Sequence, residues 1–190
     1  MNERDRPTTL QIQEELKRER HKGDYGKTLR TTIYVLLVVA AATVLLATLF
    51  FPVLQVTGTS MEPTMETGQI VVALKGSKFR QGDIVAFYYN NKVLLKRVIG
   101  NAGDQIDIKK DGTVYVNGKA LSEPYLKVKS YGQPEITYPY QVPDGKIFVL
   151  GDHRATSLDS RSKSIGCIPQ ELIVGRIIFR VWPLNRAGGL

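Results

Sequence analysis

The longest run of apolar positions extends from residue 33 to residue 54, and its 22 residues carry no charged side chain. A bilayer core of ~30 Å is crossed by about 20 apolar residues in a helix. Thr43 and Thr48 interrupt the run but can bond back to the helix backbone, and Pro52 lies near its end, where a helix can stop. The pattern predicts one transmembrane helix, which we place at residues 31–54.

A cleaved secretory signal is the alternative interpretation of this segment. Such signals usually have an apolar region of about 7–15 residues, followed by a cleavage site of the small-x-small type. Here the apolar run is longer, a charged segment precedes it, and the sequence "FFPVLQV" follows it without an A-x-A pattern. These features favour an anchor that stays on the chain.

Residues 55–190 have a different pattern, in which short runs rich in β-branched residues alternate with turn signals such as Asn90-Asn91 and Asn117-Gly118. The runs that predict strands are 70–75, 84–89, 93–99, 105–108, 113–116, 146–150 and 174–182. The segment "PQELIV" (169–174) indicates a helical turn. We therefore predict a mainly β protein, in which a single N-terminal transmembrane helix is followed by an antiparallel, β-barrel-like domain with a small β-hairpin insertion at residues 105–140.

The net charge of +8 is compatible with nucleic acid or with an anionic membrane surface. No zinc-finger spacing or RNA-recognition motif is present, so we expect no nucleic-acid partner and take the lipid bilayer as the partner. Residues 55–74 contain no Lys or Arg, whereas residues 17–30 contain Lys17, Arg18, Arg20, Lys22, Lys27 and Arg30. The positive-inside rule then places residues 1–30 in the cytoplasm and residues 55–190 outside the membrane.

Two further expectations come from the composition. Residues 8–22 read as either a short helix or a solvated charge run, and we expect a topology-setting tail. The single cysteine, Cys167, excludes an intrachain disulfide, and with His21 and His153 as the two histidines we expect neither a metal site nor a cofactor.

The first candidate for chemistry is Ser60, in the turn-like segment "TGTSMEPTM" (57–65). A loop serine is usually structural, and its hydroxyl needs a base before it becomes a useful nucleophile. His153, with Asp152 or Asp159, offers one such base in a Ser-His-Asp arrangement. However, the chain has no G-x-S-x-G elbow, and a histidine in a turn is more often a hydrogen-bonding partner.

Lys96 is the second candidate for the base. In the run "NKVLLKRVIG" (91–100), strand alternation places Lys96 on the same face as Leu94 and Val98. A lysine on an apolar face is desolvated, which lowers its pKa and allows it to act as a general base. The alternative is a strand lysine that extends its ammonium group to solvent. The residues by themselves leave both interpretations open.

The segment "GDHRATSLDSRS" (151–162) is the third candidate, because it concentrates acids, arginines and serines after a predicted strand. A solvated loop can have this composition. The spacing Asp-x-Arg, however, also suits an ion pair that braces a site, with a serine hydroxyl left to orient a neighbouring group.

Together these segments resemble the type I signal peptidases, which are membrane-anchored Ser/Lys proteases. The resemblance covers most of residues 31–184, and its specificity comes from the joint order of several segments after an N-terminal anchor. These segments are "GTSMEPTM" (58–65), "GDIVAF" (82–87), "KRVIGNAGD" (96–104), "GDHRATSLDSR" (151–161) and the closing "IVGRIIFRVWP" (173–183).

The resemblance implies a role for each matching residue. Ser60 would be the nucleophile and its backbone N–H an oxyanion donor, while Lys96 would be the general base. Ser157 would hold the lysine amine, and Asp159 with Arg161 would brace the site, in the same segment as Asp152. Gly58, Thr59 and Met61 would line the oxyanion and substrate-binding region.

The resemblance also implies an activity and a substrate, and the chain departs from the family in one place that bears on the site. We expect an endopeptidase that removes signal peptides from exported preproteins at the outer face of the cell membrane, with substrate bound as a strand along segments 57–60 and 82–88. Some relatives have a serine where this chain has Gly58, which leaves the second oxyanion donor open.

Two other classes remain as alternatives. A sortase-like transpeptidase would use Cys167, His153 and Arg176, although "SIGCIP" lacks the Thr-Leu-x-Thr-Cys context of that class. A non-catalytic, membrane-anchored β module is the other. The sequence leaves the oligomeric state and the roles of His153 and Cys167 unassigned.

Overall fold

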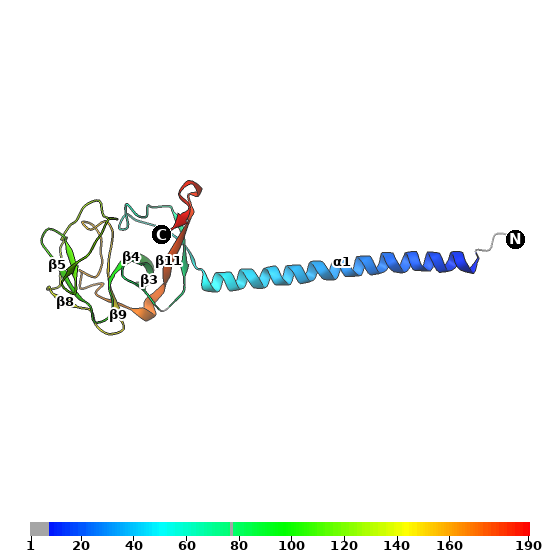
Figure 1. Ribbon diagram of the computed structural model, residues 1–190, viewed down its shortest axis with the longest axis horizontal. Coiled ribbons are helices and arrows are strands. Elements are labelled where there is room, and N and C mark those ends of the chain that lie inside the picture. Colours follow the sequence, from blue (N-terminus) through cyan, green and yellow to red (C-terminus); the bar gives the residue numbers. More distant parts are fainter. Residues whose placement is uncertain (1–7, 77) are drawn as a thin grey trace. The chain divides into compact units, whose positions relative to one another are not determined.

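The computed structural model describes residues 8–76 and 78–190, with residues 20–24 described by their backbone alone. The first part is one continuous helix, α1 (Thr9–Phe50), of 42 residues (Figure 1). Its segment Tyr25–Phe50 is long and apolar enough to cross a bilayer, and none of its residues is buried. The segment Tyr25–Phe50 is therefore long enough to span the hydrocarbon core of a bilayer, as the sequence pattern predicts.

The helix differs from the prediction at both ends. It begins at Thr9, so the charged segment is helical, which is one of the two interpretations given above and which its many Glu, Lys and Arg residues favour. It ends at Phe50, before the predicted end at residue 54, because Pro52 is followed by a strand, β1 (Val53–Gln55). Residues 1–7 of the predicted tail, and the side chains of Arg20, His21 and Lys22, lie outside the described residues.

The second part is built from two antiparallel sheets, as expected for a mainly β domain. The larger sheet has the order β1-β2-β11-β3-β4-β9-β10, and β12 pairs with β11 outside this path. Its other strands are β2 (Ile70–Leu74), β3 (Ile84–Tyr89), β4 (Lys92–Gly100), β9 (Lys146–Leu150), β10 (Ile168–Pro169), β11 (Ile173–Trp182) and β12 (Gly188–Gly189). Two short 3₁₀ turns, η2 (Gln170–Leu172) and η3 (Leu184–Arg186), flank β11, and the first matches the predicted helical turn.

The smaller sheet contains the predicted hairpin and has the order β7-β6-β5-β8. Its strands are β5 (Gln105–Ile108), β6 (Val114–Val116), β7 (Lys119–Ala120) and β8 (Tyr140–Gln141). Figure 1 places β5 and β8 together at one end of this part of the molecule, beside β9. The inserted segment is thus a small sheet rather than a lone hairpin.

A two-residue turn, Asn90-Asn91, joins β3 to β4, and both residues have positive φ, 45° and 58°. Tight hairpin turns of this kind need positive φ at both central positions, which Asn tolerates well. The turn sets Tyr89 opposite Lys92, and the register continues to Val85 opposite Lys96 and Ile84 opposite Arg97.

Three apolar clusters hold this part together. One packs Met61 and Met65 against β2, β3 and β11, and so fixes the segment that carries Ser60. A second occupies the face of β3, β4 and β9 that carries Val85 and Val98. The third joins Ile99, Phe148 and Leu150 to the smaller sheet. Burying each large aliphatic side chain stabilises the fold by about 1.5–3 kcal/mol, so these clusters position the loops between them.

Candidate active site

Ser60 lies in a turn that follows β1 and is held at both ends. Met61 and Met65 are buried, and the Gly68 N–H donates to the Val56 carbonyl at 2.9 Å. Gly58 has φ of +83°, a conformation that favours glycine, and a Cβ added there would meet no atom within 4 Å. The backbone conformation therefore explains this glycine, and the space beside it is open.

Lys96 meets Ser60 across the domain. Its Nζ lies 2.7 Å from Ser60 Oγ, and the residue is 3 % exposed. The face that it shares with Leu94 and Val98 is the predicted one, and Val85 lies directly opposite in β3. This arrangement brings together the two residues expected to be nucleophile and base, with a separation short enough for direct proton transfer.

Burial lowers the pKa of Lys96 from 10.5 to about 8. Desolvation is the largest cause, because it disfavours the ammonium form. The carboxylates of Asp159 and Asp152 act in the opposite direction, and the Arg161 guanidinium adds to the lowering. A useful fraction of Lys96 is therefore a neutral amine near neutral pH, as a general base must be.

The Ser60 N–H makes no hydrogen bond to any of the residues that the structure describes. It is therefore free to donate to a substrate oxygen, as the predicted oxyanion role requires. Thr59 is exposed, and its carbonyl accepts from the Glu62 N–H at 3.1 Å. Met61, predicted to lie at the substrate, is instead a buried anchor that is 2 % exposed, although it also borders the cavity described below.

Asp152 is buried against Arg97, the residue after the lysine. Arg97 Nε donates to Asp152 Oδ1 at 2.8 Å, and its Nη2 donates to Oδ2 at 2.6 Å. The hydroxyl of Thr64 also donates to Oδ2, at 2.5 Å. Since Thr64 belongs to the Ser60 turn, Asp152 connects that turn to β4.

Asp159 and Arg161 form the predicted ion pair. Arg161 Nε donates to Asp159 Oδ1 at 2.8 Å, and its Nη2 donates to Oδ2 at 2.9 Å. The same carboxylate accepts from the Gly151 N–H at 3.1 Å, and Arg161 Nη2 also donates to the Arg154 carbonyl at 2.7 Å. The pair thus closes the 151–161 loop on itself.

Ser157 and His153 lie beside the pair in different ways. Ser157 Oγ is buried and has no hydrogen-bond partner among the described residues, so a bond to the lysine amine stays a prediction. The His153 backbone N–H donates to the Ser60 carbonyl at 3.0 Å. Its ring Nδ1 lies 2.6 Å from Thr156 Oγ1, which engages the imidazole with its own loop.

A cavity of about 350 Å³ opens beside the two residues. Its walls are residues 54–58, 60 and 61, with Lys92–Lys96 of β4. The expectation that segment 82–88 carries substrate is wrong, because β3 is paired on one edge with β4 and on the other with β11. On β4, in contrast, β9 pairs from Arg97 onward and leaves the edge of Lys92–Lys96 open.

The remaining candidates do not come together. Cys167 is buried against the third apolar cluster, where burial raises the pKa of its thiol. Arg176 faces Asp83 at 3.4 Å, and among residues 8–76 and 78–190 no hydrogen bond or ion pair joins it to Cys167 or His153. Over the same residues, no group of three or more His, Cys, Asp or Glu side chains is placed to hold a metal ion.

Sequence reasoning missed three residues that the site uses. Arg97 and Thr64 are each close in sequence to a predicted catalytic residue, and the available signal was a second cation, Arg97, directly after Lys96 in an apolar strand. Gly151 was missed because its role is steric. A Cβ there would lie 2.1 Å from Ser157 Oγ and 2.6 Å from the Ser60 carbonyl oxygen.

Residues 29–182 match the family model described as "Signal peptidase, peptidase S26". Signal peptidase I of Bacillus caldolyticus is 40% identical over 147 residues, which cover 69% of this chain and 79% of that protein. Signal peptidase I of Bacillus licheniformis is 37% identical over 164 residues, covering 80% and 87%. Signal peptidase IB of Staphylococcus aureus (strain COL) is 40% identical over 148 residues, covering 67% and 76%.

Among solved structures, a signal peptidase I from Enterococcus faecalis V583 is 36% identical, with a TM-score of 0.45, and the match covers 52% of this chain and 96% of that one. The family model spans the apolar helix from residue 29, the Ser60 turn, β4 and the 151–161 loop. Because the family model matches residues 29–182 and two curated relatives are 40% identical, the chain belongs to the signal peptidases of family S26, which are serine endopeptidases.

Proposed function

We propose that this protein removes signal peptides from exported preproteins, with Ser60 as nucleophile and Lys96 as general base. The observation that carries the proposal is the distance of 2.7 Å between Lys96 Nζ and Ser60 Oγ in a buried setting that lowers the pKa of the lysine. Membership in the signal peptidase family supports the substrate class. The same membership argues against the sortase-like and non-catalytic alternatives.

The chemistry follows from the roles of the two side chains. The neutral Lys96 amine takes the proton of the Ser60 hydroxyl as Oγ attacks the scissile carbonyl carbon. The Ser60 N–H donates to the oxyanion that forms. The C–N bond then breaks, Lys96 returns the proton to the leaving amine, and an ester remains on Ser60. Water, deprotonated by Lys96, hydrolyses that ester and frees the serine.

The substrate is proposed to bind as an extended strand in the cavity beside the site. The open edge of Lys92–Lys96 and the segment 54–58 both offer backbone groups along that cavity. Main-chain pairing with them would align the scissile carbonyl with Ser60, and apolar side chains such as Leu95 would leave room for small residues. This placement replaces the one along 82–88.

The proposed topology has the N-terminus in the cytoplasm and residues 55–190 on the outer side. A chain with relatives among bacterial signal peptidases and an N-terminal apolar helix is a membrane-anchored protein. The orientation is supported by the lysines and arginines of residues 17–30 and their absence from 55–74. When protease is added to intact inverted membrane vesicles, we expect it to digest the first 20 residues and to leave residues 55–190 protected in the vesicle interior.

The direct test of the proposed function uses the full-length protein in detergent micelles. It is incubated with an exported precursor, and mass spectrometry locates the cut. We expect one cut at the end of the signal peptide. Cleavage that persists after Ser60→Ala would contradict the proposal.

Activity is expected to rise with pH through a midpoint of about 8. The active form of Lys96 is the neutral amine, and its fraction grows as the pH rises through the pKa. At pH 7 the rate should be about one tenth of the plateau. Measuring kcat/KM of the full-length protein from pH 6 to 10 checks this. A profile that is flat over this range would contradict the lysine base.

Cys167→Ala is expected to leave kcat and KM within about twofold of the parent, because a thiol buried in an apolar cluster acts as a small packing group. The comparison is made with the same precursor at pH 8. Loss of cleavage in this variant, with the fold retained by circular dichroism, would indicate a cysteine-based reaction instead.

A further inference from the structure

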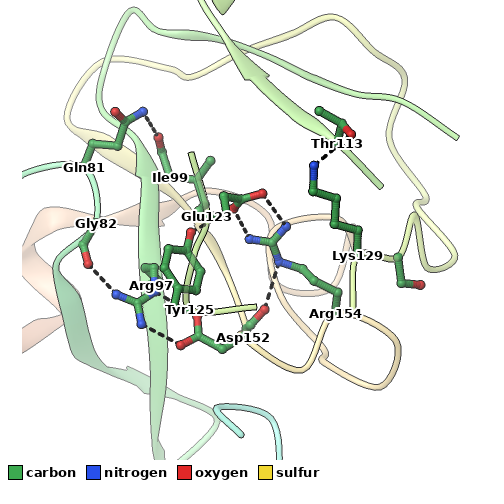
Figure 2. Close-up of polar contacts among 12 residues, drawn as sticks. Gln81, Gly82, Arg97, Ile99, Thr113, Glu123, Tyr125, Lys129, Asp152 and Arg154 are labelled. Atoms are coloured by element: carbon green, nitrogen blue, oxygen red, sulfur yellow. Dashed lines mark hydrogen bonds and ion pairs between the residues drawn. The ribbon is translucent and has the colours of Figure 1, made fainter. Parts of the chain in front are cut away.

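Two buried ion pairs lie near the catalytic residues: Arg97 pairs with Asp152, and Arg154 pairs with Glu123 (Figure 2). Glu123 belongs to the inserted segment. Arg154 donates from Nη1 to Glu123 Oε2 at 3.3 Å and from Nη2 to Oε1. The exposed fractions of these two side chains are 1% and 0%. A buried pair is retained without loss of stability only when its hydrogen bonds are satisfied, so this pair depends on the exact placement of Glu123.

Tyr125 links this pair to the other one. Its hydroxyl donates to Glu123 Oε1 at 2.8 Å, and its ring lies under the Arg97 guanidinium, with Cζ 3.8 Å from the ring centroid (Figure 2). Burial and the Glu123 charge raise the pKa of the Tyr125 hydroxyl far above its usual range, so it remains a donor. Cation–π contacts of this kind contribute most when they are shielded from water.

Both arginines then act on the residues that touch the catalytic pair. Arg97 follows Lys96 in β4 and holds Asp152 through two hydrogen bonds. Arg154 Nε donates to the Gly151 carbonyl at 3.1 Å. His153, which follows Asp152 in the chain, donates its N–H to the Ser60 carbonyl. Residues 151–153 are therefore held by the network on one side and contact the nucleophile on the other.

We propose that Glu123 and Tyr125 are positioning residues of the reaction, which hold Arg97 and Arg154 and thereby fix residues 151–153 against Ser60 and Lys96. The proposal rests on the proposed function of those two residues. Glu123 and Tyr125 make their contacts through the arginines and not through the reacting atoms. The inserted segment thus contributes to catalysis by geometry, where a misplacement of about 1 Å can reduce the rate by about 10²-fold.

Tyr125→Leu gives the decisive measurement, because it removes the ring without changing any charge. The charged groups that act on Lys96 are Asp152, Asp159 and Arg161, and the substitution removes none of these charges. We expect kcat to fall about tenfold with KM within about twofold. The midpoint of the pH profile should move above 8, because water that reaches the amine relieves the desolvation that lowers its pKa.

Tyr125→Phe is the conservative variant, since it keeps the ring under Arg97 and removes one hydrogen bond. Its kcat should stay within about threefold of the parent. Glu123→Gln keeps the shape of the side chain but leaves Arg154 without a counter-charge, and its kcat should fall about tenfold or more. Asp107→Asn is the matched control, because Asp107 belongs to the same inserted segment but pairs with Lys109 at the surface. It should keep the parental kcat and midpoint.

All variants are assayed as full-length proteins in detergent micelles with one precursor-derived peptide, below the melting temperature of each. The proposal is overturned if Tyr125→Leu and Glu123→Gln keep the parental kcat. It is also overturned if Tyr125→Leu loses rate while its pH midpoint stays at the parental value, as a smaller folded fraction alone would produce. Activity in Ser60→Ala or Lys96→Met would instead overturn the proposed function, so the two failures are distinguishable.

Discussion

Lys96→Met is expected to abolish signal-peptide cleavage while the protein stays folded. Methionine fills nearly the same volume but cannot take a proton, so the Ser60 hydroxyl loses its base at 2.7 Å. We expect kcat/KM to fall by about 10³-fold or more, as is common when one member of a nucleophile–base unit is removed. Ser60→Ala should fall to the same level, and the double variant should lose no more.

The stability of Lys96→Met should move in the opposite direction from its activity. At pH 7, below the folded-state pKa of about 8, Lys96 is protonated in both the folded and the unfolded protein, and the net effect of its buried surroundings on the ammonium destabilises the fold by on the order of 3 kcal/mol. Methionine removes this cost. Thermal unfolding by circular dichroism should therefore give a melting temperature at or above that of the parent. Lys109→Met, at an exposed lysine just after β5, is the control and should leave cleavage unchanged.

Gly151→Ala is expected to lower the cleavage rate by about 10²-fold, because the added methyl group has no room. It would lie 2.1 Å from Ser157 Oγ, 2.5 Å from Ser157 Cβ and 2.6 Å from the Ser60 carbonyl oxygen. One of these contacts involves the backbone of the nucleophile, so relief requires movement of Ser60 itself. Overpacking of this kind also destabilises a protein by about 1–3 kcal/mol.

The matched control for this variant is Gly76→Ala, where a Cβ meets nothing within 4 Å and φ is not positive. It should keep the parental rate and melting temperature. Single-turnover cleavage and thermal unfolding of both variants separate the two effects. A Gly151→Ala protein with the parental single-turnover rate would show that the close packing between Ser157 and Ser60 is not needed for the chemistry.

Much of the fold could be predicted from local patterns. Each of the seven strands expected from alternation and turn signals has a counterpart within a residue or so of its predicted ends. The strands that were missed, β1, β7, β8, β10 and β12, have two or three residues each, which is too short for a period of two to be recognised. Their pairing depends on neighbours already in place.

The site was predictable to the extent that its partners are close in sequence or match the family. The Asp159–Arg161 pair spans two residues and was expected from its spacing. The Arg97–Asp152 and Arg154–Glu123 pairs join residues 55 and 31 positions apart, so only the folded chain brings them together. The substrate edge was misplaced because a strand run does not reveal which of its edges its neighbours will occupy.

The Asn90-Asn91 turn has a consequence for chemistry at a distance. It sets which residue of β4 lies opposite Val85, and the two adjacent residues there are Lys96 and Arg97, which face opposite sides of the sheet. A shift of one position would exchange them and present to Ser60 a guanidinium that cannot give up its proton in a protein. The length of the turn, as well as the residue at position 96, therefore decides which side chain acts as the base. An insertion or deletion in this hairpin would abolish activity without altering any residue of the active site.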